Sequence, residues 1–454
     1  MREAPNALAL AERACLLAEG DEADAVVTAE RSGLARFADS AVHQPTLVED
    51  RSVGVRVVRD GRIGCATTNR VDDAGLRALV ARAAEIADRA PVDPGFPGLP
   101  DRAAPPDVEG WDEETAAHGP ADQAERAWAA IEAAGDLGLY GYYTSGETEL
   151  AVASTRGVAV SQAITDVAVL ALAAGDGRSG YADASSWRAG DIDPAAVARD
   201  AAEKAARTER AGEVEPQTFR AVLEPYAFAE LLWYFGYSSL GALGLLEERS
   251  YLSGRMGEQA FDEAFSLYDD GLDPAGLPKA FDFEGVPKRC VPIVKNGVVT
   301  DVVWDCRTAA RAGRESTGHA LPPPAQAHGP QAFNLSVAPG DASVEELVSR
   351  VGDGIYVTRL HYLNIVDPRE GLITGMTRDG TFRIENGRVT EPLVNLRFTT
   401  SFPALVASLL GLGAHARLVN QNDFYGERYP YGVVVPAVAT EAFTVTGSGS
   451  GPGL

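Results

Sequence analysis

Residues 224–247, EPYAFAELLWYFGYSSLGALGLLE, are the most concentrated apolar segment of this chain. At a period of 3.6 residues its apolar side chains fall on every face, and a helix of that kind is buried on all sides. Pro225 suits the first helical turn, and Glu230 lies near the positive end of the helix dipole. Three glycines cost helix propensity but let another backbone approach closely: Gly236, Gly241 and Gly244. The sequence therefore predicts one buried helix on which the rest of the fold is built.

A membrane-spanning helix is the rival interpretation of this stretch. The run from Leu231 to Leu246 is slightly short for that purpose, and Ser238 and Ser239 interrupt it. The stretch also contains no His, Cys or Asp, so it cannot ligate a metal by itself. We therefore expect a buried helix of a soluble protein.

The composition is that of an acidic globular protein. The 454 residues allow two or three domains with a large core, and 65 acidic residues against 40 basic ones give a formal net charge of −25. Such a charge repels phosphate backbones and anionic membranes, and the sequence has no local basic patch. The composition thus argues against direct binding to nucleic acid or to a membrane.

The cysteines and the first residues point to the cytoplasm. The residues MREAPNALALAERACLLAEG contain Glu3 and Glu12, and their apolar positions have helical spacing, which predicts an amphipathic helix and not a signal peptide. The cysteines are far apart, without a C-x-x-C pair, and indicate buried thiols in a reducing compartment: Cys15, Cys65, Cys290 and Cys306.

Local patterns divide the chain into three units of an α+β fold. Residues 1–90 and 112–215 each combine helices with antiparallel hairpins, and the proline-rich residues 91–111 link them. Residues 216–446 are predicted to form a large, mostly antiparallel β domain that contains the buried helix. Residues 447–454, GSGSGPGL, are predicted to be a disordered tail.

Two-residue turns between alternating apolar runs predict the hairpins. Asp60-Gly61 is predicted to join the strand containing Val53, Val55 and Val57 to its partner. Asn296-Gly297 and Asn386-Gly387 predict two more turns of the same kind. Two Asn-Gly hairpins in one region argue for a sizeable antiparallel sheet or a closed barrel. Spacing and capping residues also predict helices over residues 5–19, 72–90, 121–134, 194–207, 344–351 and 401–412, and strands over residues 354–360 and 437–447.

The sequence offers no metal-binding motif. It contains no H-E-x-x-H and no two histidines at i, i+4. The histidines are scattered, and their spacing does not suggest a shared ligand set: His43, His118, His319, His328, His361 and His415. We therefore predict no zinc site built by this chain alone.

The loop GRESTGHALPPP, residues 313–324, is the best local candidate for a functional site. Ser316 or Thr317 could act as a nucleophile with His319 as the base, and these residues with Gly318 could contact a substrate. The favoured alternative is that the hydroxyls close backbone turns. Carboxylates elsewhere, such as Glu258 and Asp269-Asp270, are likewise more typical of turn caps than of acid–base pairs.

Several segments together resemble the TldD/PmbA family, and specifically its PmbA (TldE-like) branch. They span nearly the whole chain and keep their order and spacing. They are SVGVRVVRDGRIGCATTNRVD (52–72), the S-x-L-x-G-R-M-G-E of residues 250–258, SLYDDG (266–271), VPIVKNGVVTDVVWDCRTAARAGRESTGHA (291–320), GIYVTRL (354–360) and TRDGTFRIENGRVTEPL (377–393).

The resemblance implies a role in a two-subunit peptidase. Members of this family pair as heterodimers in which the TldD-type subunit carries an H-E-x-x-x-H zinc motif on the helix that corresponds to the opening stretch, with a Cys ligand near its carboxyl terminus. The complex trims or degrades small and unfolded peptides. The family is also associated with modulation of DNA gyrase, but the charge of −25 makes direct contact with DNA a poor explanation of that association.

In this chain the corresponding helix is LLWYFGYSSLG. The resemblance places Trp233, Tyr234 and Tyr237 where the ligands and the general base would stand. Near the carboxyl terminus LVNQNDFYG supplies no Cys and offers only Asn420, Asn422 and Asp423. A zinc hydrolase needs three protein ligands and a polarised water, so these positions predict a degenerate site without metal or catalytic residues.

The first hypothesis is therefore a non-catalytic subunit of a TldD/TldE-type zinc metallopeptidase, with zinc in the partner and a peptide as substrate. The hairpin-rich third unit would also offer strand edges suited to peptide capture. One alternative is an autonomous hydrolase that uses the Ser316, Thr317 and His319 loop. Another is a homodimeric peptide-binding module.

Overall fold

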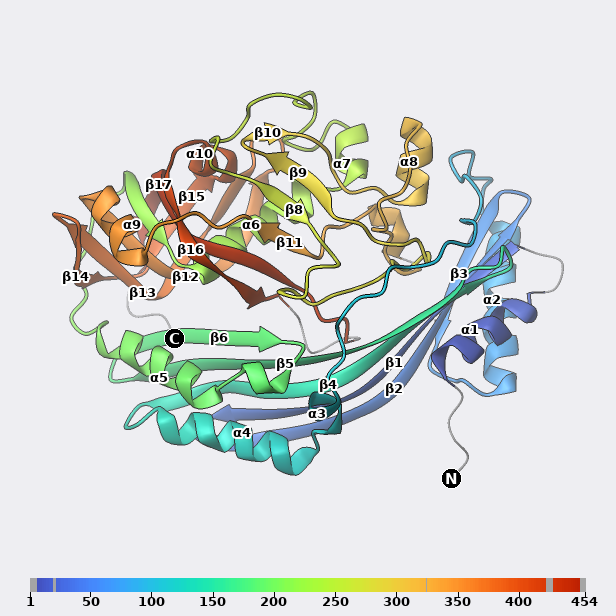
Figure 1. Cartoon of the computed structure of the whole chain (residues 1–454), viewed down its shortest axis with the longest axis horizontal. Coiled ribbons are helices and arrows are strands. Elements are labelled where there is room, and N and C mark those ends of the chain that lie inside the picture. Colours follow the sequence, from blue (N-terminus) through green and yellow to red (C-terminus); the bar gives the residue numbers. More distant parts are fainter. Residues whose placement is uncertain (1–5, 19–21, 324, 422–427, 450–454) are drawn as a thin grey trace.

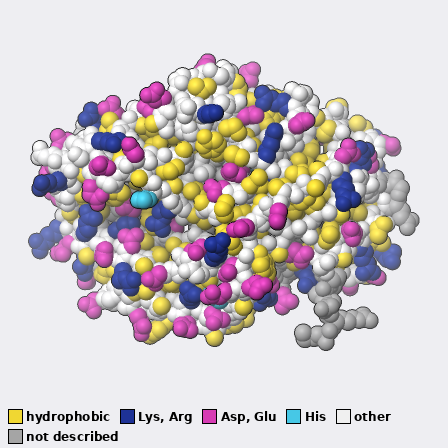
Figure 2. Space-filling view, in the orientation of Figure 1, with side chains coloured by type: hydrophobic (Ala, Val, Ile, Leu, Met, Phe, Trp, Pro, Cys, Tyr) yellow, Lys and Arg dark blue, Asp and Glu magenta, His cyan; other side chains and the backbone are white. Residues whose placement is uncertain are grey.

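The structure is a computed structural model of the whole chain, and it describes residues 6–18, 22–323, 325–421 and 428–449. It has a curved six-stranded sheet with helices on one face and a larger β domain on the other (Figure 1). Hydrophobic side chains gather across the middle of the view in Figure 2, where the β domain meets this sheet. Among the described helices, none is long and apolar enough to cross a membrane.

The two amino-terminal units share one antiparallel sheet, here called sheet A, with the order β3-β2-β1-β4-β5-β6. Its central pair joins the units, since β1 of the first pairs with β4 of the second from Asp24↔Ser154 to Phe37↔Gly141. The strands are β1 (Glu22–Ala38), β2 (Ala41–Arg59), β3 (Arg62–Thr68), β4 (Gly138–Ser154), β5 (Ala159–Gly175) and β6 (Arg178–Ser186). The helices are α1 (Ala7–Leu16), α2 (Asp73–Arg89), α3 (Glu113–Ala117), α4 (Pro120–Ala133) and α5 (Pro194–Ala206), with a short 3-10 turn at Ala189–Asp191.

The alternation of side chains along the strands sets the two faces of sheet A. Ala25 and Val27 of β1 lie in the apolar cluster with α1 and α2, and further along the same face Phe37 packs with α4 and α5. The intervening Val26 faces the other way, in a cluster with Phe281 and Phe283 of the β domain. Sheet A is therefore covered on both faces, by helices and by the third unit.

The β domain contains the larger sheet, here called sheet B, which is mostly antiparallel. Its strand order β17-β15-β13-β12-β7 returns to β17 through a further β7–β17 pairing, so these strands form a closed ring. Among the strand pairs of the described residues, β7–β12 and β11–β17 are the parallel ones. The strands are β7 (Thr218–Leu223), β8 (Leu267–Asp269), β9 (Val291–Lys295), β10 (Val298–Val299), β11 (Leu335–Val337), β12 (Gly354–Asp367), β13 (Leu372–Glu385), β14 (Arg388–Leu393), β15 (Leu396–Ser401), β16 (Leu409–Asn420) and β17 (Gly432–Ser448). The helices are α6 (Pro225–Ser239), α7 (Ala242–Leu246), α8 (Cys306–Ala312), α9 (Val344–Val351) and α10 (Phe402–Ala407), with a 3-10 turn at Ala325–His328.

The predicted hairpins form where the turn residues indicated them. Asp60 and Gly61 have φ of 47° and 73°, as a two-residue turn of this kind requires, and they join β2 to β3. Asn296-Gly297 and Asn386-Gly387 have the same left-handed geometry and join β9 to β10 and β13 to β14. The α+β fold class predicted from the sequence is confirmed.

The prediction that residues 224–247 form one helix buried on all sides is wrong. The stretch breaks at Leu240–Gly241 into α6 and α7, because the backbone there pairs with Val303. A Cβ on Gly241 would lie 2.3 Å from the Pro330 carbonyl oxygen, so the glycine allows this close backbone approach. One side of α6 is also open, since Tyr237 is 59% exposed.

Two further predictions need correction. The predicted helix 401–412 ends at Ala407, and the apolar residues from Leu409 onward form β16 because they pair with β17. Gly447 and Ser448 of the predicted tail belong to β17, where Arg397 and Leu396 pair with them, whereas residues 450–454 lie outside the described residues.

Candidate functional site: the α6 helix and the residues around it

The α6 helix is the element on which the candidate site is built. It follows β7 directly, and Pro225 opens its first turn after Glu224, whose extended backbone forms the amino-terminal cap. Its inner face is anchored by aromatic packing, with the ring of Phe235 stacked 4.5 Å from that of Phe402 and Phe228 5.8 Å from the same ring. The opposite side of α6 presents Trp233, Tyr234 and Tyr237, which are half-buried or exposed.

Trp233 lies in a three-ring stack. Its ring centroid is 4.9 Å from that of Tyr431 and 6.0 Å from that of Phe333, and both pairs are close to parallel. Phe333 also contacts Tyr431 at 5.2 Å and Tyr429 at 5.9 Å. Aromatic pairs at these spacings contribute about 0.5–1.5 kcal/mol each beyond their area burial. The stack fills the space beside α6 with apolar rings.

Tyr237 borders a hollow on the open side of α6. This hollow has a volume of about 260 Å³ and reaches from α6 to His328 and Ile365. Tyr234 is half-buried, and burial raises the pKa of its hydroxyl. These tyrosines therefore offer phenol groups and ring faces, and not the imidazole or carboxylate ligands of a zinc site.

Asn420 ends β16 and faces sheet A. Its side-chain amide donates to the hydroxyl of Tyr142 on β4 at 3.3 Å. The predicted site residue therefore links the two parts of the molecule. Asn422 and Asp423 lie outside the described residues.

Glu230 is the one acidic residue within α6, and sequence reasoning treated it only as a dipole partner. Burial raises the pKa of its carboxyl to about 7, while the positive charge of Arg359 acts in the opposite direction. This carboxyl is therefore close to half-protonated at neutral pH. It lies one turn before Trp233, which is on the helix that the resemblance links to the metal site.

The residues around α6 do not fit a zinc ion. Trp233 and Tyr431 have no nitrogen or thiolate lone pair to offer, and Glu230 would be a single carboxylate where three protein ligands are needed. Across the residues that the structure describes, no group of three His, Cys, Asp or Glu could hold a metal ion. We therefore assign no step of chemistry to a metal on this chain.

The predicted loop site lies in the interior. Thr317 is fully buried and His319 is 2% exposed, while Ser316 is half-buried with its hydroxyl donating to the Trp304 carbonyl at 3.1 Å. The His319 imidazole joins Thr317 Oγ1, 2.9 Å from Nδ1, to Asp269 Oδ1, 2.8 Å from Nε2. A Cβ on Gly318, whose φ is 77°, would lie 2.7 Å from the Pro287 carbonyl oxygen. The four residues are together in space, and Thr317, Gly318 and His319 are buried while Ser316 is half-buried. Their role in substrate binding stays a prediction.

Burial also makes this constellation a poor nucleophile–base pair. It lowers the pKa of His319 below its ordinary value, and the nearby Lys288 ammonium lowers it further. The imidazole serves as a hydrogen-bond bridge between the loop and Asp269 of β8. This geometry matches the turn-closing alternative more closely than catalysis.

Sequence reasoning missed the segment 428–431. Arg428 forms a two-bond ion pair with Asp166 of sheet A, at 2.8 Å and 2.6 Å, and both side chains are at most 5% exposed. Tyr429 and Tyr431 then enter the aromatic stack. The local sequence ERYPYG carries no pattern for this role, because each partner lies far away in the chain.

Models of one protein family match all three units of the chain. The model described as the PmbA/TldA metallopeptidase C-terminal domain matches residues 216–447, and those for domain 1 and the central domain match residues 23–87 and 112–209. A metalloprotease of Methanothermobacter thermautotrophicus is 28% identical over 230 residues, which are 49% of this chain and 48% of that protein. The metalloprotease PmbA of Escherichia coli O157:H7 is 22% identical over 207 residues, 44% of this chain and 43% of that protein. The chain spans about half the length of the curated relatives it matches.

Solved structures extend the likeness of the fold. TldE from Thermococcus kodakarensis superposes with a TM-score of 0.86 at 19% identity, covering 96% of this chain and 100% of that one. A putative modulator of a DNA gyrase from Thermotoga maritima gives a TM-score of 0.82 at 20% identity, covering 96% and 99%. At these identities the superpositions show the fold alone.

Proposed function

The chain belongs to the PmbA/TldA metallopeptidase family, and we propose that within it this chain is the non-catalytic subunit of a two-chain zinc metallopeptidase acting on small or unfolded peptides. The zinc ion would be held by a TldD-type partner. A cytoplasmic location, as expected from the sequence, is part of this proposal.

The observation that carries the proposal is the stack of Trp233, Tyr431 and Phe333. It stands on the helix to which the family resemblance assigns the metal motif. Replacing polar ligands by packed rings removes the desolvation cost of a buried polar site and keeps α6 fixed to its neighbours. The subunit would then contribute the fold and part of the peptide-binding surface, while the chemistry takes place on the partner.

The test compares this chain alone with the same chain co-purified with a TldD-type protein from the same organism. Cleavage of an unfolded peptide and bound zinc are measured in both samples. We expect stoichiometric zinc and chelator-sensitive cleavage in the pair, and neither in the chain alone.

Two substitutions in this chain sharpen the comparison. Glu230→Gln removes the one carboxyl of α6, and Thr317→Val removes the hydroxyl of the buried loop while keeping its shape. Both are expected to leave cleavage by the pair within about twofold, since a non-catalytic chain supplies no reacting group. Cleavage or stoichiometric zinc in the chain alone would refute the proposal, as would loss of the pair's activity in either variant with the pair still assembled.

A further inference from the structure

One side of strands β12 and β13 lies open near the turn that joins them. The inward side chains of this region, Leu363 and Ile373, belong to the core around α6. The side chains that alternate with them along the two strands are exposed or half-buried, and we call them the outer face: Tyr362, Asn364, Val366, Leu372, Thr374 and Met376. Further along the same strands, α9 covers the outward residues Tyr356 and Phe382. The outer face is thus the part of this side that remains in contact with solvent.

An uncharged row crosses the middle of the outer face. Asn364 pairs with Thr374, and Thr374 pairs with Thr399 of β15, whose hydroxyl donates to the Thr374 hydroxyl at 3.1 Å. Apolar residues flank this row on both strands: Tyr362, Met376, Val366 and Leu372. The outer face therefore combines apolar surface with uncharged hydrogen-bonding groups, and the centre of a protein–protein interface has this composition.

Tyr362 extends into solvent from a β-bulge. The pairing of β12 with β13 shifts between His361 and Asn364, and Tyr362 has a φ of 53°. Bulky residues rarely adopt this left-handed conformation, and bulges commonly redirect a side chain. The Tyr362 side chain is 73% exposed, and Val366 is 52% exposed. The backbone therefore holds a large aromatic side chain in water, where a protein partner would bury it.

The β12–β13 turn links the outer face to the hollow beside α6. Ile365 precedes Val366 on β12 and lines this hollow together with Tyr237 of α6 and with Pro368, which lies in the turn. A protein surface that wraps around the turn would therefore contact the outer face on one side and the rim of the hollow on the other. Such a protein would stand beside the open side of α6, where Tyr237 is exposed.

We infer that the outer face and the β12–β13 turn are the docking surface for the zinc-bearing TldD-type subunit. This inference rests on the proposed function, which requires one such partner. Tyr362 is the anchor that the partner buries, since tyrosines at the centre of an interface carry a large share of its affinity. Arg397 of β15 pairs with Met376 at the margin of the outer face and is exposed, without an ion pair among the described residues. A carboxylate of the partner would meet this guanidinium.

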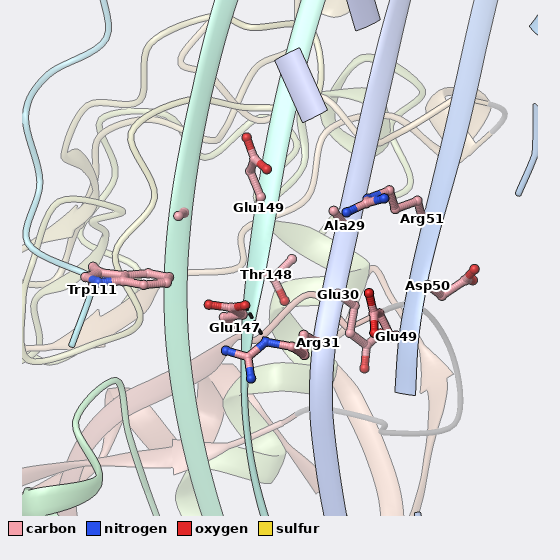
Figure 3. Close-up of a pocket in the computed structure, with 11 residues that line it drawn as sticks. Ala29, Glu30, Arg31, Glu49, Asp50, Arg51, Trp111, Glu147, Thr148 and Glu149 are labelled. Atoms are coloured by element: carbon pink, nitrogen blue, oxygen red, sulfur yellow. Dashed lines mark hydrogen bonds and ion pairs between the residues drawn. The ribbon is translucent and has the colours of Figure 1, made fainter. Parts of the chain in front are cut away.

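Charge and position favour this occupant and this surface. A second copy of the chain is disfavoured as the occupant, because each copy carries a net charge of −25. The hollow of sheet A, with a volume of about 390 Å³, is a poorer surface for the partner (Figure 3). The carboxylates of Glu49, Glu147 and Glu149 line it, and such groups are depleted at the centres of interfaces. The outer face, by contrast, carries no charged residue and adjoins α6, the helix to which the family resemblance assigns the metal site.

The test measures the Kd between the full chain and a purified TldD-type protein from the same organism by isothermal titration calorimetry. Tyr362→Ser combined with Val366→Ser should weaken association by about tenfold or more, and Arg397→Gln by about two- to fivefold. The matched control, Trp128→Ser combined with Leu47→Ser, changes an aromatic and an aliphatic residue that are 53% and 66% exposed on α4 and β2. It should leave the Kd within about twofold. The melting temperatures of all variants alone should match the wild type, because the altered side chains are exposed.

Hydrogen exchange locates the bound partner. The TldD-type protein should slow exchange of the amides in residues 362–376, and this protection should be lost in the Tyr362→Ser, Val366→Ser variant.

The outcomes separate this inference from the proposed function. If the pair assembles and cleaves peptide while the double variant binds as the wild type does, the docking surface is wrong and the proposed function stands. Protection confined to other segments, or equal weakening by the control variant, leads to the same conclusion. If the two proteins do not associate at all, both the inference and the proposed function fail. Protection of residues 362–376 that grows with the concentration of this chain alone would also overturn the inference, because it would assign the outer face to a second copy.

Discussion

Replacing Asp166 by asparagine tests how the β domain is held against sheet A. The carboxylate accepts two hydrogen bonds from Arg428, at 2.8 Å and 2.6 Å, and the two side chains are 3% and 5% exposed. Removing one partner of a buried ion pair costs about 3–5 kcal/mol, because the remaining charge is left uncompensated. Arg428 keeps a bond to Thr144 Oγ1 at 3.1 Å, which places the expected loss near the lower end, about 3 kcal/mol.

The loss is measured by urea unfolding of the wild type and of Asp166→Asn, compared at equal m value so that the difference reports the native state. Glu441→Gln is the matched control, since the Arg220–Glu441 pair is equally short, at 2.8 Å, but about half exposed. We expect the control to change the free energy of unfolding by less than about 1 kcal/mol. Equal losses in the two variants would refute the reasoning that burial makes the Arg428 pair strong.

Three further outcomes follow from buried charges and close backbones. Burial raises the pKa of Glu230 from 4.5 to about 7, so the contribution of this carboxyl to stability is present below pH 4.5 and is lost as pH rises through 7. Glu230→Gln should therefore stabilise the protein at pH 8 by up to about 3 kcal/mol. An unchanged melting temperature at pH 8 would contradict this. Burial lowers the pKa of Lys279 from 10.5 to about 7, so between pH 7 and pH 10.5 the protein takes up a proton when it unfolds. The free energy of unfolding of the wild type should therefore rise with pH in this range. In Lys279→Met this rise should be lost, as measured by chemical denaturation at a series of pH values. Gly241→Ala would place a Cβ 2.3 Å from the Pro330 carbonyl oxygen and should cost about 1–3 kcal/mol, while Gly244→Ala, at 3.6 Å from its nearest atom, should be neutral or stabilising in thermal denaturation.

Local turn chemistry in the sequence was enough to predict the hairpins. Asp60-Gly61 and the two Asn-Gly pairs adopt left-handed backbone angles that few other residues accept, so their role does not depend on distant partners. The residues after Ala407 were mispredicted for the opposite reason. The run LLGLG has no strong preference of its own, and pairing with β17 decides that it is a strand.

Some features of the candidate site could likewise be predicted from the sequence, and others could not. The apolar character of α6 and the places of Trp233 and Tyr237 could be inferred from the sequence with the family resemblance. The partners of Trp233 could not, because Phe333 and Tyr431 reach it from segments about 100 and 200 residues away. The burial of His319 could not be predicted either, because it depends on how β8 and the loop pack together.

The position of β17 in the chain has a consequence for biosynthesis. This strand occupies residues 432–448 and closes the ring of sheet B by pairing with β7, more than 200 residues earlier. A ribosome releases the chain from its amino terminus, so the first two units and their shared sheet can form while β17 is still being made. The β domain, with α6 at its centre, can be completed only after residues 432–448 have emerged. Until then the nascent chain carries an open ring and an uncovered apolar helix, and this interval is where we expect it to depend most on chaperones.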